Sequence, residues 1–229
     1  MGQEPPSVIP GRPSAADPAR LTAPGFVEVE VGVSSTHERS EIDVLETPIL
    51  LKYSLSPHVQ LRFGAAGLVR PLRGGGSTEF SDLSLGVQGY FLEQARVGVD
   101  IAVRGTVNVL NLQHNTLHPD LSFLLLLSKD LNAVHVDANA GFTHFSHRAS
   151  FPRNEVCWAV ALDGPVSEVI GWATEIRAAH SSADDPVFGL LAATFEAKSS
   201  LVLDVGVEFG LNESAPRYKV LGGLTFLLR

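Results

Sequence analysis

The feature that most constrains this chain is a repeated alternation of apolar and polar residues over strand-length runs. Near the end of the sequence, Leu201, Leu203 and Val205 fall on one face of such a run, whereas Asp204 and Glu208 fall on the other. Because successive side chains of a β-strand point to opposite faces, the pattern predicts a strand with one apolar face. That face can meet a protein core or lipid, and strand length and connectivity distinguish the two.

Runs of this kind recur along the sequence and predict twelve strands. Their expected ranges are 26–34, 47–55, 58–69, 79–92, 95–107, 118–128, 133–144, 155–163, 168–179, 186–197, 200–210 and 217–228. Most contain nine to fourteen residues, whereas strands of soluble proteins usually contain about 5–6. A tilted strand that crosses a membrane needs about 9–11 residues. Strand length therefore favours a membrane-spanning barrel.

The connections between these runs alternate between short and long. The short ones are 56–58, 93–95, 129–132, 164–168 and 198–200, and the mostly longer ones are 34–46, 70–78, 108–118, 145–154, 181–186 and 212–217. Outer-membrane barrels have short periplasmic turns and longer outer loops. The sequence therefore predicts an all-β fold, a 12-stranded antiparallel up-and-down transmembrane β-barrel over residues 25–229, with both chain ends on the short-turn side.

Charged residues lie within the predicted strands, on the polar face. A charge that faces lipid at mid-depth costs roughly 2–4 kcal/mol, so we expect these side chains to line the lumen. The acidic ones are Glu28, Glu30, Asp82, Asp100, Asp137, Glu175, Asp204 and Glu208, and the basic ones are Lys52, Arg62, Arg104, Arg177 and Lys219. They predict either a charged constriction that selects permeants, with the acidic excess favouring cations or neutral solutes, or ion pairs that fill a narrow lumen.

Composition argues against several other classes of protein. The net charge is −8 and no basic cluster occurs, which argues against nucleic-acid binding. No segment approaches the ~18–20 apolar residues of a membrane-spanning helix. Cys157 is the only cysteine, so an intrachain disulfide is impossible.

The N-terminal residues 1–24 are polar and proline-rich, and they lack the apolar core of a signal peptide. We expect them to form a flexible segment on the periplasmic side that can enter the lumen. A bacterial outer-membrane location requires a signal peptide, which we expect to have been removed before residue 1. A protein that stays inside the cell is the alternative.

A soluble lipocalin-like barrel or β-sandwich is the alternative fold. Two features favour it: Tyr and Trp, which form the aromatic girdles of membrane barrels, number only 3 and 2, and the chain ends in Phe-Leu-Leu-Arg rather than in an aromatic residue. A soluble barrel, however, would place apolar side chains inside and charges outside. Strand length, alternating connections and one-sided charges favour the membrane barrel.

Four stretches resemble, in order and spacing, one family of outer-membrane barrels. They are "PGFVEVEVGVS" (24–34), "ETPILLKYSLSPHVQLRFG" (46–64), "FSDLSLGVQGYFLE" (80–93) and "LDVGVEFGLNESAPRYKVLGGLTF" (203–226). They are similar to the first strand, the second hairpin, an Asp-x-Ser-Leu-Gly strand and the closing hairpin of the MetA-pathway of phenol degradation family. The resemblance implies an outer-membrane barrel that passes small or aromatic molecules.

The function we expect is passive diffusion of small, aromatic or hydrophobic solutes through a channel. Its partners would be outer-membrane lipid and a small-molecule permeant; no cofactor, metal or nucleic acid is expected, and the sequence does not define an oligomeric state. The alternative is a closed barrel with a structural or interaction role.

A third hypothesis is an outer-membrane lipid hydrolase, although we expect no enzyme. His144 and Ser146 are two residues apart, so they share one face of a strand, and a serine nucleophile needs a nearby histidine base. His147 follows directly, but no Asp or Cys has the spacing to complete a metal site with these histidines.

Overall fold

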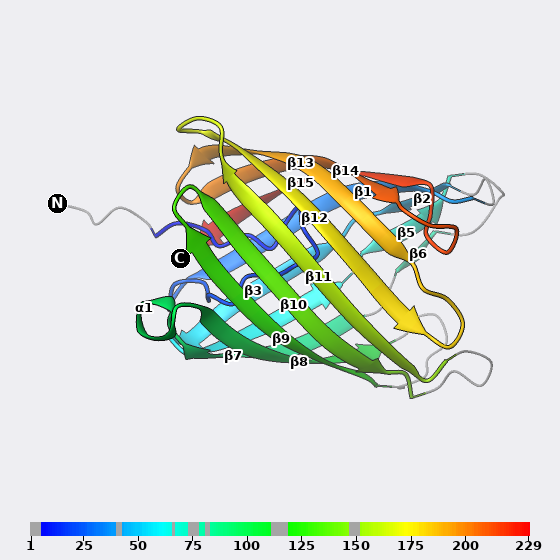
Figure 1. Ribbon diagram of the computed structural model, residues 1–229, viewed down its shortest axis with the longest axis horizontal. Helices are drawn as coiled ribbons and strands as arrows, with labels where there is room; N and C mark the ends of the chain where they lie inside the picture. Colours follow the sequence, from blue (N-terminus) through cyan, green and yellow to red (C-terminus); the bar gives the residue numbers. More distant parts are fainter. Residues whose placement is uncertain are drawn as a thin grey trace.

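The alternating runs form one antiparallel sheet that closes on itself, and the prediction of a twelve-stranded barrel is confirmed (Figure 1). The computed structural model describes residues 6–39, 43–65, 67–72, 78–80, 83–110, 119–146 and 152–229. Pairing of β15 with β1 closes the barrel. The elements are β1 (Val27–His37), β2 (Asp43–Glu46), β3 (Ile49–Ser56), β4 (Val59–Ala65), β5 (Leu68–Pro71), β6 (Glu79–Phe80), β7 (Leu83–Leu92), α1 (Gln94–Val97), β8 (Asp100–Leu110), β9 (Asp120–Leu131), β10 (Val134–His144), β11 (Asn154–Pro165), β12 (Ile170–Ser181), β13 (Val187–Lys198), β14 (Leu201–Gly210) and β15 (Tyr218–Leu228).

The two ends of the barrel differ in their connections. The turns after β3, β9, β11 and β13 contain few residues, and they lie at the same end as α1 and the C-terminus, on the left in Figure 1. We call this the short-turn end, and the opposite one the long-loop end. The alternation of short and long connections along the sequence is therefore reproduced in the fold.

Two barrel strands are interrupted, so that β2 and β3, and β4 and β5, each form one strand in two parts, and β6 and β7 pair with these two parts along the next strand position. Thr47 and Pro48 separate β2 from β3, because proline has no N–H for the ladder. Gly67 precedes β5 with a φ of +66°, and an added Cβ would lie 2.1 Å from the carbonyl oxygen of Thr47. Only glycine fits at position 67, because its φ is positive and the Thr47 backbone lies too close for a side chain.

One predicted strand begins later than expected. The range 95–107 was predicted to be extended, but Gln94–Val97 form a single helical turn and β8 starts at Asp100. Gly98 ends the turn with a φ of +83° and donates its N–H to the carbonyl of Gln94 at 2.8 Å. Among the described residues, no helix is long and apolar enough to cross a membrane.

Apolar side chains cover the outside of the barrel, and polar side chains fill the inside. On β7, Leu83, Leu85 and Val87 are 44%, 43% and 51% exposed, whereas Gln88 is fully buried. Glu28 on β1 is fully buried as well. A soluble protein rarely exposes an apolar patch larger than a few hundred Å². An apolar outer face with charges inside is the arrangement of a transmembrane barrel.

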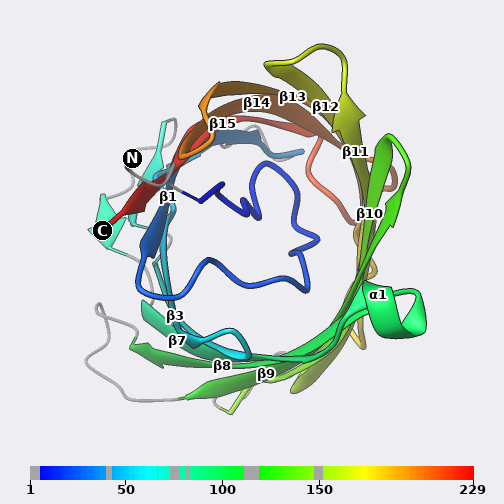
Figure 2. The ribbon, with the colours of Figure 1, turned by 90° about the vertical axis from the view of Figure 1, so that its left-hand side faces the viewer.

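The lumen contains part of the chain itself. Residues 6–26 precede β1 and run through the inside of the barrel, as the dark blue ribbon in Figure 2 shows. We call these residues the luminal segment. They have no helix or strand of their own, so their backbone N–H and C=O groups need partners from the wall.

Candidate functional site

The first anchor of the luminal segment is a charged group on β1 and β3. Glu28 accepts a hydrogen bond from the backbone N–H of Ile9 at 2.8 Å, and Glu30 accepts one from Gly11 at 2.9 Å. The Lys52 ammonium lies between both carboxylates, 2.7 Å from Glu28, and donates to the carbonyl oxygen of Ile9 at 2.8 Å. One buried cation thus lies between two buried carboxylates, which leaves the group with a net negative charge, and all three side chains bind the backbone of the segment.

Arg12 forms the second anchor by lying flat on the barrel wall. Its Nε and Nη2 atoms donate to the two carboxylate oxygens of Asp204 at 3.2 and 3.0 Å. Gly32, Gly223 and Asp204 are neighbours across β1, β15 and β14. An added Cβ would lie 2.4 Å from Arg12 Nη1 at Gly32 and 2.5 Å from Arg12 Nε at Gly223. The two glycines thus make room for the guanidinium group.

Asp17 is the third anchor and pairs with two arginines of the wall. Its carboxylate contacts Arg62 Nη2 at 3.0 Å and also Arg104 Nη1. Burial alone would raise the pKa of Asp17, but the charges of Arg104, Arg62 and Lys52 outweigh this effect and hold the pKa below its ordinary value of 3.8. The Asn139 amide exchanges two hydrogen bonds with the Asp17 backbone, at 2.8 and 3.0 Å.

Glu175 on β12 binds two consecutive peptide groups. One of its oxygens accepts hydrogen bonds from the N–H groups of Ala15 at 2.8 Å and Ala16 at 2.6 Å. The Ala16 side chain packs against Ala159 and Ala161 of β11. Small residues on both sides let the segment approach the wall closely.

The last anchor holds Arg20 at the short-turn end. The guanidinium contacts Asp100 of β8 at 2.7 Å and Asp130 of β9 at 2.6 Å. The N–H of Ala19 donates to the Ser128 hydroxyl at 2.7 Å, next to a small apolar contact with Ala102 and Leu126. The luminal segment is thus bound along its length by side chains from most of the circumference.

Most predicted lumen residues contact this segment. The contacting residues are Glu28, Glu30, Lys52, Arg62, Asp100, Arg104, Glu175 and Asp204. Arg177 instead pairs with Glu208 through two hydrogen bonds of 2.9 Å, and Asp137 bonds with Ser128 and His135. Lys219 lies near the long-loop end and pairs with Glu46 at 3.3 Å. Asp82 lies outside the described residues.

Neutral side chains of the wall also bind the segment, although the predicted lumen residues are all charged. Gln60 accepts from the N–H of Thr22 at 2.9 Å, and the Gln88 amide donates to the carbonyl oxygens of Pro18 and Ala19 at 3.1 and 3.2 Å. Gln60 and Gln88 lie on the polar faces that the alternation already defines. Counting every polar residue on those faces would have found them.

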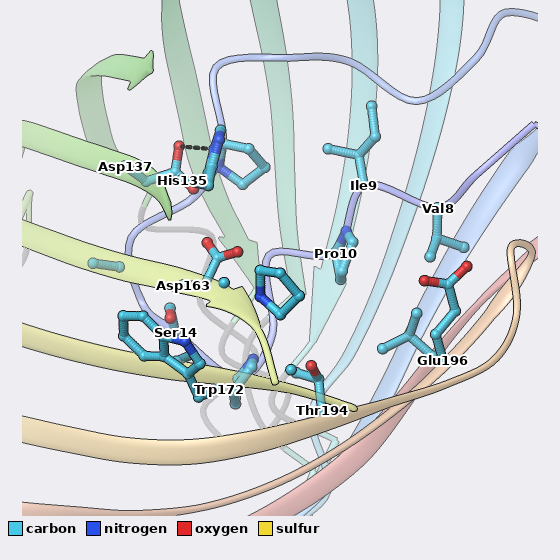
Figure 3. A pocket seen from close by; sticks show the side chains of 18 of the residues that line it. Val8, Ile9, Pro10, Ser14, His135, Asp137, Asp163, Trp172, Thr194 and Glu196 are labelled. Carbon is cyan, nitrogen blue, oxygen red and sulfur yellow. Dashed lines mark hydrogen bonds and ion pairs between the residues drawn. The ribbon is translucent and has the colours of Figure 1, made fainter. Parts of the chain in front are cut away.

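The luminal segment separates two cavities. The larger, of ≈ 530 Å³, opens at the short-turn end between the segment and β9–β14, and Figure 3 shows its lining. The smaller, of ≈ 300 Å³, lies toward the long-loop end beside Arg104, Thr143 and Glu155. Residues of the luminal segment thus line both cavities, Ala15 the smaller one and residues such as Ile9, Arg12 and Ala16 the larger one.

The residues of the hydrolase hypothesis are not joined in the structure. Nδ1 of His144 bonds with the Asn154 side chain at 2.9 Å, and the N–H of Ser146 donates to Asp120 at 3.0 Å. His144 and Ser146 are both exposed, and His147 lies outside the described residues. Within the described part of the chain, no hydrogen bond joins His144 to Ser146.

Comparison with solved structures gives the class of barrel. The COG4313 outer membrane channel from Pseudomonas putida F1 matches with a TM-score of 0.71 and 12% identity, over 94% of this chain and 99% of that one. The KdgM porin matches with a TM-score of 0.61 and 6% identity, over 88% of this chain and 99% of that one. This is the fold of outer-membrane channels.

No protein-family model matches the chain, and no curated protein matches it by sequence. The resemblance to the MetA-pathway of phenol degradation family therefore stays a prediction.

Proposed function

We propose that this protein is a bacterial outer-membrane channel for small solutes, gated by its own N-terminal segment. The observation that carries the proposal is the course of residues 6–26 through a polar lumen, where the wall binds them at each stage. While these residues are docked, they obstruct the barrel. When they leave, a continuous polar passage opens.

The chemistry of the contacts supports a reversible plug. The segment is held mainly by hydrogen bonds and ion pairs, and the buried hydrophobic side chains that it contributes are those of Val8, Ala16 and Ala19. Polar groups released into a wet lumen regain hydrogen bonds with water, so undocking costs only the net difference of about 0.5–1.5 kcal/mol for each neutral bond. Little apolar surface opposes the release.

The charge of the wall supports a preference for cationic or neutral solutes in the open state. Acidic side chains outnumber basic ones among the buried residues of the wall. Arg12 and Arg20 of the segment neutralise Asp204 and Asp100 in the docked state. Undocking removes both arginines, and rings of uncompensated carboxylates attract cations. Aromatic or hydrophobic solutes, which the family resemblance implies, are the neutral candidates.

Single-channel recording in planar bilayers tests the gate. Deletion of residues 2–21 should produce stable conductance steps that are larger than those of the intact protein. A variant in which residues 8–20 are replaced by Gly and Ser at equal length should behave like the deletion, because it lacks the anchors. A deletion variant that is folded by heat-shifted gel mobility but does not conduct would support the closed, structural barrel instead.

Ion selectivity tests the charge argument separately. Asp100→Asn and Asp204→Asn, made in the deletion variant, should each lower the preference for K⁺ over Cl⁻ in a salt gradient. An unchanged reversal potential would remove the acidic filter from the proposal while leaving the gate intact.

A further inference from the structure

A cluster of potential metal ligands lies at the short-turn end, on strands β9, β10 and β11. In the sheet register, His135 stands directly opposite Asp130 on one side and Asp163 on the other. Asp137 lies two residues along β10, so its side chain shares the face of His135. All four residues line the ≈ 530 Å³ cavity. Figure 3 labels three of them, His135, Asp137 and Asp163.

The distances suit a small cation. One ligand atom from each of His135, Asp137 and Asp163 lies within 4.8 Å of the others, and His135 Nε2 is 3.2 Å from Asp137 Oδ1. A tetrahedral zinc ion with bonds of about 2.0–2.2 Å separates its ligand atoms by about 3.4 Å. Small rotations of the Asp163 side chain would therefore complete the triad, and the cavity leaves the fourth position open.

The second nitrogen of His135 has the partner that metal-bound histidines usually have. Nδ1 of His135 lies 2.5 Å from Asp130 Oδ1. A metal-ligating histidine almost always donates its other N–H to a carboxylate or carbonyl, which fixes the tautomer with Nε2 free for the metal. The hydroxyl of Ser128 donates a hydrogen bond to the Asp137 carboxylate and so orients it. This shell of supporting contacts is an observation independent of the three ligands.

Charge also favours a cation here. Asp130, Asp137 and Asp163 surround one histidine, and the one basic side chain in contact with them among the described residues is Arg20. Asp163 has no hydrogen-bond or ion-pair partner in the described part of the chain. A single imidazole with two carboxylates is a ligand set for Zn²⁺ or a related transition metal rather than for Ca²⁺, which prefers oxygen ligands only.

We propose that His135, Asp137 and Asp163 bind a divalent transition-metal ion, with Zn²⁺ as the probe, at the short-turn mouth of the barrel. The sequence predicts no metal, and of these residues only Asp137 is among the predicted lumen residues. Asp130 supports His135 through one oxygen and binds Arg20 of the luminal segment through the other. The site does not depend on gating, because its three ligands all belong to the barrel wall.

Isothermal titration of the metal-stripped, detergent-folded full chain with ZnCl₂ tests the site. We expect saturable binding in the intact protein, loss of that binding event in His135→Gln, and at least tenfold weaker binding in Asp163→Asn. Asp130→Asn, which removes the supporting carboxylate, should weaken binding by about 10–100-fold. Co²⁺ in place of Zn²⁺ should give visible absorption bands that Asp163→Asn abolishes.

The matched control is His180→Gln, which removes another histidine paired with an aspartate, Asp185, at the opposite end of the barrel. This variant should bind Zn²⁺ like the intact protein. Heat-shifted gel mobility verifies that each variant is folded, and Asp163→Asn breaks no contact that the fold uses. Absence of saturable binding, or binding that survives both His135→Gln and Asp163→Asn, would overturn the proposal and leave the cluster as an ion-pair group.

Discussion

Replacing Asp17 by Asn probes the anchor in which one carboxylate of the luminal segment pairs with two arginines of the wall. The substitution keeps the size of the side chain but removes the charge that compensates Arg62 and Arg104. The side chains of Asp17, Arg62 and Arg104 are only 15%, 9% and 15% exposed, so solvent screens these pairs weakly. Removing one partner of a buried ion pair costs about 3–5 kcal/mol. The amide oxygen can still accept one hydrogen bond, so we expect the lower end, about 3 kcal/mol.

This loss falls on the docked state alone, because water solvates both arginines once the segment has left. At 1.4 kcal/mol for each factor of ten, the ratio of docked to undocked segment should fall about a hundredfold. Amide hydrogen exchange of residues 11–22, followed by mass spectrometry on the micelle-bound protein, measures this ratio even when the undocked population is small. Exchange should accelerate about a hundredfold, the same factor as the docking equilibrium.

Glu208→Gln is the matched control. It removes a luminal carboxylate that pairs with Arg177, yet Glu208 makes no hydrogen bond or ion pair with the luminal segment in the described structure. Exchange of residues 11–22 should therefore be unchanged in this variant. Equal exchange rates in Asp17→Asn and the intact protein would refute the assignment of Asp17 as an anchor.

The effect of Asp17→Asn on amide exchange should be independent of pH between pH 5 and pH 7. The pKa of Asp17 is lowered in the docked state, so its stabilisation is fully present above the ordinary value of 3.8 and is lost only as the pH falls through the docked-state pKa. After correction for intrinsic exchange, the effect of Asp17→Asn should be equal at pH 5 and pH 7. A smaller effect at pH 5 would show that the two arginines do not hold the carboxylate ionised.

Three further substitutions test other parts of the structure. Gly32→Ala places a Cβ 2.4 Å from Arg12 Nη1 and should accelerate exchange near Arg12, whereas Gly222→Ala, whose Cβ meets only a backbone oxygen at 3.4 Å, should not. Glu175→Gln weakens two charge-assisted hydrogen bonds and should speed exchange of Ala15 and Ala16 by about tenfold or more. Leu191 is 62% exposed on the outer face of β13, and Leu191→Arg should cost about 2–4 kcal/mol in urea unfolding from vesicles if this face meets lipid. Leu211→Arg, beyond the end of β14, should cost only about 0–1 kcal/mol. Equal costs for the two arginine variants would contradict the lipid-facing assignment.

The fold was predictable because each strand carries its own signal. Period-two alternation predicts where the strands lie, and their length favours a barrel that spans a membrane. Charges on one face of each strand predict which face lines the lumen. The strand start at residue 95 was wrong because α1 depends on the left-handed conformation of Gly98 and on Asp100, which accepts from the N–H of Gln94 at 2.7 Å. The breaks at Thr47 and Gly67 likewise depend on contact between two strands.

The lumen-facing direction of Glu28, Asp100 and Glu175 followed from the sequence, but their partners did not. Alternation reports the face of a strand on which a residue lies, and it carries no information about the residue across the lumen. The hydrogen bonds of the luminal segment join positions up to 192 residues apart, as for Arg12 and Asp204. Polar, proline-rich composition predicted a segment without its own core, and flexibility of residues 1–24 stays a prediction.

The sequence by itself determined the architecture of this protein, because local alternation and strand length act within each strand and need no knowledge of its neighbours. Only the tertiary structure decided what the inward charges do. Closure of the barrel brings Glu28, Asp204 and Glu175 around one lumen, where Glu28 and Glu175 bind the backbone of the luminal segment and Asp204 binds the Arg12 side chain. Strand register, which is set when neighbouring strands pair, likewise places Asp130 and Asp163 on either side of His135 and forms the proposed metal site.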